Sequence, residues 1–233
     1  MIGQAAAVAA TALAAYGPLP AFGWKAYQKR RLSQPSRSPE LVLTFDDGPD
    51  GRYTEELLDI LARFEVPAVF FVVGNKALKY RHVVDRIVAE GHQLGLHSLK
   101  HTNGLLLTPW AQKKDMLYCK AIMEGHGWPV RYYRPPWGLA NLATLYMAKK
   151  LNYDLLYWSV MAQDWEYAND EEEILRRLEA RVHNGAIICL HDSGEDTGGD
   201  EGAAEHTLKA LERFIPLMQA KGYRFVLPEE VRR

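Results

Sequence analysis

The chain has 233 residues, of which 48% are hydrophobic and 24% are charged. This composition excludes an intrinsically disordered chain and predicts one globular core with an appendage. The formal net charge is -1, so there is no global basic surplus and we expect no nucleic-acid partner. Cys119 and Cys189 lie far apart in the sequence and form neither a close-spaced zinc pair nor a disulfide framework.

Residues 1–24 contain no charged side chain and include the apolar run AAAVAATALAAY. This run predicts a weakly hydrophobic helix, interrupted at Gly17-Pro18, that by itself is shorter than the roughly 30 Å hydrocarbon core of a bilayer. We expect a membrane anchor or a signal-like helix here, with a loosely packed extension as the alternative. Residues 25–39 carry five basic side chains and end in SQPSRSP, which predicts a basic linker.

From residue 40 onward, short β-branched runs alternate with longer amphipathic segments. We expect strands at 41–45, 68–73, 93–96, 132–134, 154–158, 186–190 and 223–226. We expect helices at 54–64, 81–90, 108–124, 142–150, 171–182 and 204–221. Helical crossovers make the strands parallel, and about seven such repeats predict an α/β fold, a distorted and incomplete (β/α) barrel. An open doubly wound sheet is the alternative.

Polar residues gather where the predicted strands end. The first strand ends in TFDDGPD, the third in HSLKH and the fourth in RPPWG, while QDW follows the fifth and CLHD closes the sixth. In parallel α/β architectures these strand ends meet on one face. We therefore expect the five segments to form one site. The glycine-rich, acidic stretch SGEDTGGDEGAAEH that follows predicts a mobile loop at its rim.

Two of these segments indicate a metal site. Adjacent carboxylates at Asp46 and Asp47 repel each other unless a cation or a shared proton relieves them. His97 and His101 have a spacing that places two imidazoles on one face of a helical turn, where both reach a single ion. Alone, each pattern also fits a plain Asp-Gly turn or two packed histidines. Together, Asp47, His97 and His101 predict an N₂O ligand set with open positions, which is typical of catalytic zinc.

The segments TFDDGPD, HSLKH, RPPWG, QDW and CLHD, in this order, resemble the five motifs of the polysaccharide deacetylases, carbohydrate esterase family 4 with its NodB homology domain. The resemblance extends over residues 40–228. It implies a hydrolase that removes acetyl groups from N-acetylhexosamine polymers such as peptidoglycan or a chitin-like chain. It also implies a divalent metal held by Asp47, His97 and His101. Zn²⁺ is the expected ion, with Co²⁺, Ni²⁺ or Mn²⁺ as alternatives.

The resemblance implies roles for four further polar side chains. Asp46 is the expected general base, taking the proton from the attacking water, and Arg134 is expected to pair with it. His191 is the expected general acid that protonates the departing sugar nitrogen. Asp164 is expected to hold His191 as an imidazolium, because a nearby carboxylate raises a histidine pKa.

The remaining expected site residues bind substrate. Trp137 and Trp165 would line the cleft and stack on pyranose rings, and the backbone N–H of Trp137 would donate to the oxyanion. Cys189 stands two places before His191, where the family usually has leucine, and Leu190 follows it. We expect these two to line a slightly roomier but still apolar pocket for the acetate methyl group.

The chain thus divides into an apolar segment (1–24), a basic linker (25–39) and a deacetylase domain (40–233). We expect a monomer in the cell envelope, anchored to the membrane or secreted, because an uncharged apolar start is hard to explain in a cytosolic enzyme. The basic residues after the apolar run leave a cytoplasmic location open. Two other functions also stay open: a catalytically silent carbohydrate-binding protein on this fold, and a cytosolic amidohydrolase of a small amide.

Overall fold

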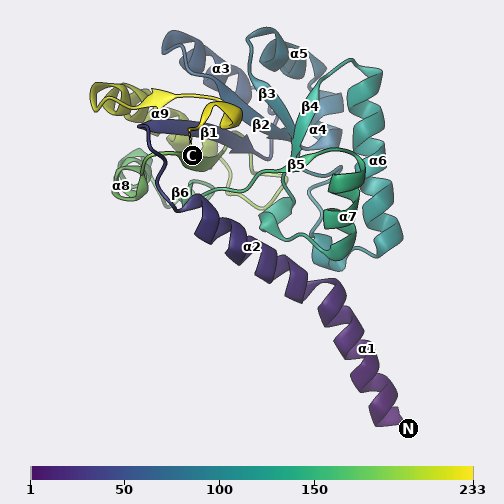
Figure 1. The fold of residues 1–233 in the computed structure, drawn as a ribbon. Helices are drawn as coiled ribbons and strands as arrows, with labels where there is room; N and C mark the ends of the chain where they lie inside the picture. Colours follow the sequence, from purple (N-terminus) through teal and green to yellow (C-terminus); the bar gives the residue numbers. More distant parts are fainter. Residues whose placement is uncertain (1, 233) are drawn as a thin grey trace.

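The computed structural model describes residues 2–232, which form one α/β body with a helical arm at its N-terminus (Figure 1). The body is built on parallel strands in the order β5-β4-β3-β2-β1-β7-β6, and the short β8 pairs with β1 outside this path. The strands are β1 (Glu40–Asp46), β2 (Ala68–Val72), β3 (Gln93–Leu96), β4 (Val130–Tyr133), β5 (Asp154–Leu155), β6 (Val160–Met161), β7 (Ala186–His191) and β8 (Arg224–Phe225). Because the path ends at β5 and β6, the sheet is an incomplete (β/α) barrel, which confirms the expected fold.

Helices cross over between the strands. They are α3 (Tyr53–Arg63), α4 (Gly74–Lys79), α5 (Arg81–Ala89), α6 (Pro109–Gly125), α7 (Leu142–Lys150), α8 (Glu171–Arg181) and α9 (Ala203–Ala220). Three of them start at side-chain caps: Thr108, Asn141 and Asp170 each accept a hydrogen bond from a backbone N–H in the first turn. Short 3₁₀ turns lie at η1 (Gly104–Leu106), η2 (Pro136–Gly138) and η3 (Pro228–Glu230).

The alternation of side chains along β1 decides what faces the site. Leu41, Leu43 and Phe45 belong to the main hydrophobic core, which α3 and α9 help to form. Val42 points to the other side and packs in a second, smaller cluster. Successive residues of a strand point to opposite faces of the sheet, so Asp46 lies on the face of Val42, inside the half-barrel.

Two segments differ from the expected elements. The strand expected at 154–158 is shortened to β5, and β6, where we expected no strand, follows it at the opposite end of the sheet path. The short helix α4 forms directly after β2, where we expected no element. Both are only a few residues long, too short for hydrophobic periodicity to reveal them.

The N-terminal arm consists of α1 (Ile2–Tyr16) and α2 (Pro18–Leu32). Helix α1 projects away from the body, whereas α2 lies along it and buries Ala21, Gln28 and Leu32 (Figure 1). The expected linker at 25–39 therefore begins within a docked helix. By length and composition, Ala6–Leu32 is the one candidate membrane span among the described residues, and 11% of its most apolar window is buried.

Candidate active site

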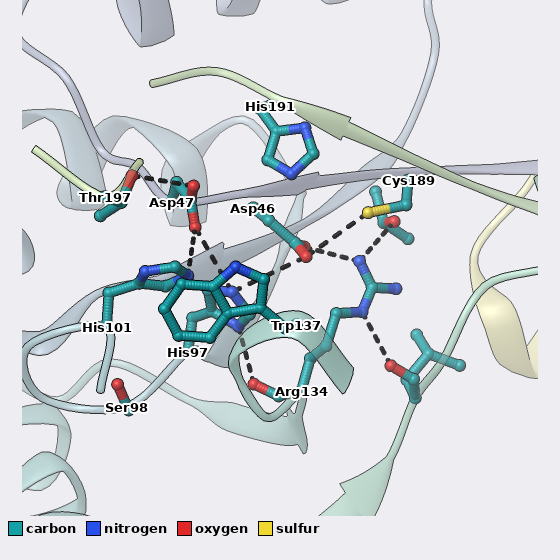
Figure 2. A network of polar contacts seen from close by, with 12 residues as sticks. Asp46, Asp47, His97, Ser98, His101, Arg134, Trp137, Cys189, His191 and Thr197 are labelled. Carbon is teal, nitrogen blue, oxygen red and sulfur yellow. Dashed lines mark hydrogen bonds and ion pairs between the residues drawn. The ribbon is translucent and has the colours of Figure 1, made fainter. Parts of the chain in front are cut away.

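Three potential metal ligands converge at the ends of β1 and β3. Asp47 follows β1 directly, and His97 and His101 follow β3. The Nε2 atom of His101 lies 3.1 Å from Asp47 Oδ1, and the Nε2 atom of His97 lies 3.4 Å from the same oxygen. All three ligand atoms lie within 4.8 Å of one another (Figure 2). The neighbouring parallel strands thus bring the expected ligand set together.

The protonation states of Asp47 and His101 suit a divalent cation. Asp47 Oδ1 is buried and has no hydrogen-bond partner among residues 2–232. Burial raises the pKa of Asp47, but contact with His97 and the positive charge of His191 act in the other direction, and that pKa lies well below its usual value. Burial lowers the pKa of His101 to about 4, so its imidazole is neutral at pH 7. A carboxylate beside neutral imidazole is a donor set that zinc and similar ions accept.

The orientation of His97 is set by its other ring nitrogen. His97 Nδ1 lies 2.7 Å from the carbonyl oxygen of Arg134, to which it donates a hydrogen bond. This bond leaves the lone pair on Nε2, the atom that faces Asp47.

The backbone between the two histidines is irregular, so the helical turn we expected there is wrong. Ser98 and His101 have φ angles of 67° and 52°, in the left-handed region. The carbonyl oxygen of Ser98 accepts a hydrogen bond from the backbone N–H of Gly74, at the start of α4. Because the carbonyl bonds to a neighbouring helix, it is not available for a helical turn, and the histidines meet through a loop.

Backbone strain is concentrated around the site. Non-glycine residues rarely adopt positive φ angles, and they keep them only where the surrounding structure imposes them. Of the seven such residues between positions 2 and 232, five lie at the strand ends near the site: Asp47, Ser98, His101, Trp137 and Gln163. The backbone at these strand ends is therefore irregular where it positions the side chains of the site.

A buried ion pair holds Asp46. Arg134 Nη1 donates to Asp46 Oδ1 over 2.6 Å, and both side chains are nearly inaccessible to solvent. The guanidinium also donates from Nε to the carbonyl oxygen of Leu156, and it lies 4.0 Å from the centre of the Phe71 ring. Asp46 is thereby fixed with one carboxylate oxygen on Arg134.

A second carboxylate holds His191. Asp164 Oδ1 lies 3.1 Å from His191 Nδ1, and Asp164 Oδ2 accepts from the backbone N–H of His191 over 2.7 Å. Thr207 Oγ1 donates to Oδ2 as well. Burial lowers the pKa of His191, but the charge and hydrogen bond of Asp164 raise it to about 10. The ring is therefore an imidazolium at neutral pH, with Nε2–H available as a proton donor.

A cavity of about 310 Å³ lies at these strand ends. Its polar lining includes two aspartates and three histidines: Asp46, Asp47, His97, His101 and His191. Trp137 and Trp165 form part of its wall. The Trp137 indole lies 4.4 Å from the His101 ring, centre to centre, and is 48% exposed. The Trp165 ring meets His191 edge-on at 5.3 Å. An exposed aromatic face beside a polar cleft suits stacking on a sugar ring.

This arrangement matches known proteins. Residues 33–156 match the sequence profile of the family described as polysaccharide deacetylase. The chain belongs to the polysaccharide deacetylase family. A peptidoglycan-N-acetylglucosamine deacetylase of Bacillus cereus is 30% identical over 200 residues, which are 85% of this chain and 91% of that protein.

The similarity of this deacetylase family member to two other matches also extends over most of both chains. A chitooligosaccharide deacetylase of a Bradyrhizobium strain is 30% identical over 84% of this chain and 91% of that protein. The crystal structure of the Bc1960 peptidoglycan N-acetylglucosamine deacetylase is 30% identical, with a TM-score of 0.76 over 84% of this chain and 89% of that one. The half-barrel and the family assignment thus have independent support from sequence and structure.

Cys189 stands at the position where the family resemblance led us to expect leucine. Cys189 lines the cavity, and its Sγ lies 3.4 Å from Asp46 Oδ2. Burial raises the pKa of the thiol, so Cys189 stays protonated and donates to the carboxylate. Leu190, the next residue along β7, lies in the main core beneath the helices and is fully buried there. The expectation that Leu190 contacts substrate is not supported by this placement, because adjacent strand residues face opposite ways.

Two residues of this deacetylase site were not predicted from the sequence. Thr197, in the glycine-rich stretch after β7, donates a hydrogen bond to Asp47 (Figure 2). Lys25, on α2, lines the cavity and reaches the carbonyl oxygen of Trp137. Neither lies in a recognisable motif. The only signals were the position of the stretch directly after CLHD and the absence of other charges before Lys25.

Proposed function

We propose that this family member is a divalent-metal-dependent enzyme that removes acetyl groups from N-acetylhexosamine units of a polysaccharide, peptidoglycan or a chitin-like chain. The observation that supports this most directly is that a proton acceptor and a proton donor lie beside one set of potential metal ligands. Asp46 and His191 both line the cavity that contains the ligand atoms of Asp47, His97 and His101.

Asp47, His97 and His101 would hold the cation. When bound, a divalent cation supplies Lewis acidity, which lowers the pKa of water and polarises an amide carbonyl. Three protein ligands would leave coordination positions open for water and substrate, as a catalytic site requires. Zn²⁺ fits this donor set, and Co²⁺, Ni²⁺ and Mn²⁺ are the alternatives to be distinguished by elemental analysis.

Asp46 accepts the proton of the attacking water. Arg134 occupies one carboxylate oxygen of Asp46, and the Cys189 thiol lies near the other. The ion pair keeps the carboxylate aimed along the cavity, so no reorientation is needed when the proton moves. Arg134 is thus a positioning residue for this base.

His191 delivers a proton to the departing sugar nitrogen. Asp164 binds the Nδ1 side, so the proton on Nε2 is the one that is transferred. On the resemblance to the family, the backbone N–H of Trp137 donates to the oxyanion that forms on the former acetyl carbonyl. Trp137 and Trp165 hold the sugar ring while these steps occur.

The domain organisation and location belong to the same proposal. Residues 40–233 form the deacetylase domain, and the apolar segment 1–24 attaches it to a membrane in the cell envelope. The relatives named for peptidoglycan and the apolar composition of α1 support this location. Protease treatment of intact cells tests it: an envelope domain is cleaved, whereas a cytoplasmic one is protected. The chain is proposed to act as a monomer.

The activity is tested by measuring acetate released from N-acetylglucosamine oligomers and from peptidoglycan by the full-length protein. We expect release that a chelator abolishes and added Zn²⁺ restores. Asp46→Asn should lower kcat by roughly 10²- to 10⁴-fold, the usual contribution of a general base, while metal content stays at the wild-type level. Asp59→Asn, on the exposed side of α3, serves as the control. Absence of metal-dependent release from every acetylated glycan would favour the silent carbohydrate-binding alternative.

A further inference from the structure

The loop between β7 and α9 reaches back over the metal ligands. Thr197 in this loop donates from Oγ1 to Asp47 Oδ2 over 2.8 Å, across 150 positions of sequence (Figure 2). The same hydroxyl lies 3.1 Å from the carbonyl oxygen of Gly194. A hydroxyl has one proton to donate, and the shorter contact is to the charged acceptor, which forms the stronger bond.

The two oxygens of Asp47 have different surroundings. Oδ1 faces the imidazoles of His97 and His101 and has no hydrogen-bond partner among the described residues. Oδ2 faces away from them and is held by Thr197. A carboxylate held at one oxygen cannot rotate freely about its terminal torsion, so the other oxygen stays directed between the two imidazoles.

We propose that Thr197 is a positioning residue that sets the affinity of the site for its divalent cation. The inference rests on the metal site of the proposed function and deepens it. His97 is oriented by the carbonyl of Arg134, and Asp47 is oriented by Thr197, so two of the three ligands have a partner behind them. Outer partners of this kind typically alter metal affinity by 10- to 100-fold when they are removed.

The glycines of the loop explain how Thr197 reaches Asp47. The loop folds tightly on itself: the backbone N–H of Gly199 donates to the carbonyl oxygen of Gly194 over 2.7 Å. A Cβ atom placed on Gly199 would lie 3.0 Å from the Gly194 Cα, so a side chain there would push the two strands of the loop apart. Glycine at these positions permits the close approach that presents Thr197 to the cavity.

The far side of the loop is tied to the segment that carries Trp165. The backbone N–H of Asp200 donates to the carbonyl oxygen of Trp165, and the Asp200 side chain accepts from the N–H of Tyr167. The loop therefore connects Asp47, which follows β1, with the segment of Trp165, which follows β6. The acidic, glycine-rich stretch is thus assigned a role in holding the metal site, rather than serving only as a solvated rim.

The test is the Zn²⁺ affinity of the full-length protein, measured by competition with a chromogenic chelator and independent of any substrate. Thr197→Val keeps the shape of the side chain but removes the hydroxyl, and we expect roughly 10- to 100-fold weaker binding. Thr197→Ser retains the hydroxyl and should bind within roughly threefold of the wild type. Thr11→Val makes the same chemical change on α1 and should leave affinity unchanged.

The outcomes separate this inference from the proposed function. If the wild type and Thr197→Val bind Zn²⁺ equally tightly, the role of Thr197 is refuted and the metal site stands. If the wild type binds no divalent ion, both proposals fail. Equal loss in the valine and serine variants would assign the effect to loop packing and overturn the hydrogen-bond argument. Thermal melting of the metal-free variants identifies any that fail to fold.

Discussion

Lys25 on helix α2 donates a hydrogen bond from Nζ to the carbonyl oxygen of Trp137 over 2.7 Å. Its ammonium also lies 5.3 Å from the centre of the Trp158 ring. Trp137 has a φ angle of 54°, and its indole packs on the metal-site histidine His101. Helix α2, which precedes the barrel in sequence, therefore forms part of the wall of the candidate active site and holds Trp137, another residue of that wall, in place.

Replacing Lys25 should impair catalysis more than folding. Lys25→Met removes the donor, and loss of one charge-assisted hydrogen bond of about 1.5 kcal/mol corresponds to roughly a tenfold decrease in kcat. Lys25→Arg keeps a donor and should recover part of the rate. Steady-state acetate release measures both, with Lys29→Met on the exposed side of the same helix as the control. A kcat for Lys25→Met within twofold of the wild type would contradict the role.

The pH dependence of the reaction should report the pairing of Asp164 with His191. Because the Asp164 carboxylate raises the His191 pKa to about 10, the imidazolium donor persists through neutral pH and is lost as the pH rises through that value. Asp164→Asn removes the charge, so the pKa falls and the alkaline decline of kcat moves to lower pH. Profiles of kcat against pH for both proteins test this, with the exposed Asp154→Asn as reference. An unmoved alkaline limb would count against His191 as the acid.

The ion pair between Arg134 and Asp46 should show strong energetic coupling. Arg134→Met leaves the Asp46 carboxylate buried without its cation, and breaking such a pair costs about 3–5 kcal/mol of unfolding free energy. The double variant Arg134→Met/Asp46→Asn removes both charges and should lose less than the sum of the single variants. Urea denaturation of the four proteins of this cycle gives the coupling energy. Strictly additive losses would show that the two side chains do not interact in the folded protein.

Cys189 should widen the range of acyl groups that the enzyme accepts. Cys189→Leu places a larger side chain at the cavity wall and removes the thiol that faces Asp46. We expect the kcat/KM for an N-propionyl oligomer, relative to the N-acetyl oligomer, to fall roughly tenfold in this variant, since one methylene in a pocket is worth about 1–3 kcal/mol. Leu190→Met, on the core side of β7, should leave the ratio unchanged. Equal ratios in Cys189→Leu and the wild type would exclude Cys189 from the acyl pocket.

Much of the framework could be predicted from the sequence because its signals are local. The alternation of β-branched and amphipathic segments reports burial and backbone preference residue by residue, and it located most strands and helices to within one to three residues. The convergence of Asp47 with His97 and His101 followed from one rule about parallel sheets, that strand ends meet at one edge. The sequence also contained the reason why Leu190 faces the core: it directly follows Cys189 on the same strand, and adjacent strand residues point to opposite faces of the sheet.

What the amino-acid sequence determined by itself is the order of the elements, the parallel half-barrel and the ligand set at its strand ends. Only the tertiary structure decided that Thr197 meets Asp47, that Lys25 meets Trp137 and that α2 is docked on the body. The first two contacts join residues 150 and 112 positions apart, at loop and helix positions without a periodic pattern. Their geometry depends on how the whole sheet curves and on which crossovers pack beside each other, and no local preference of the chain encodes that.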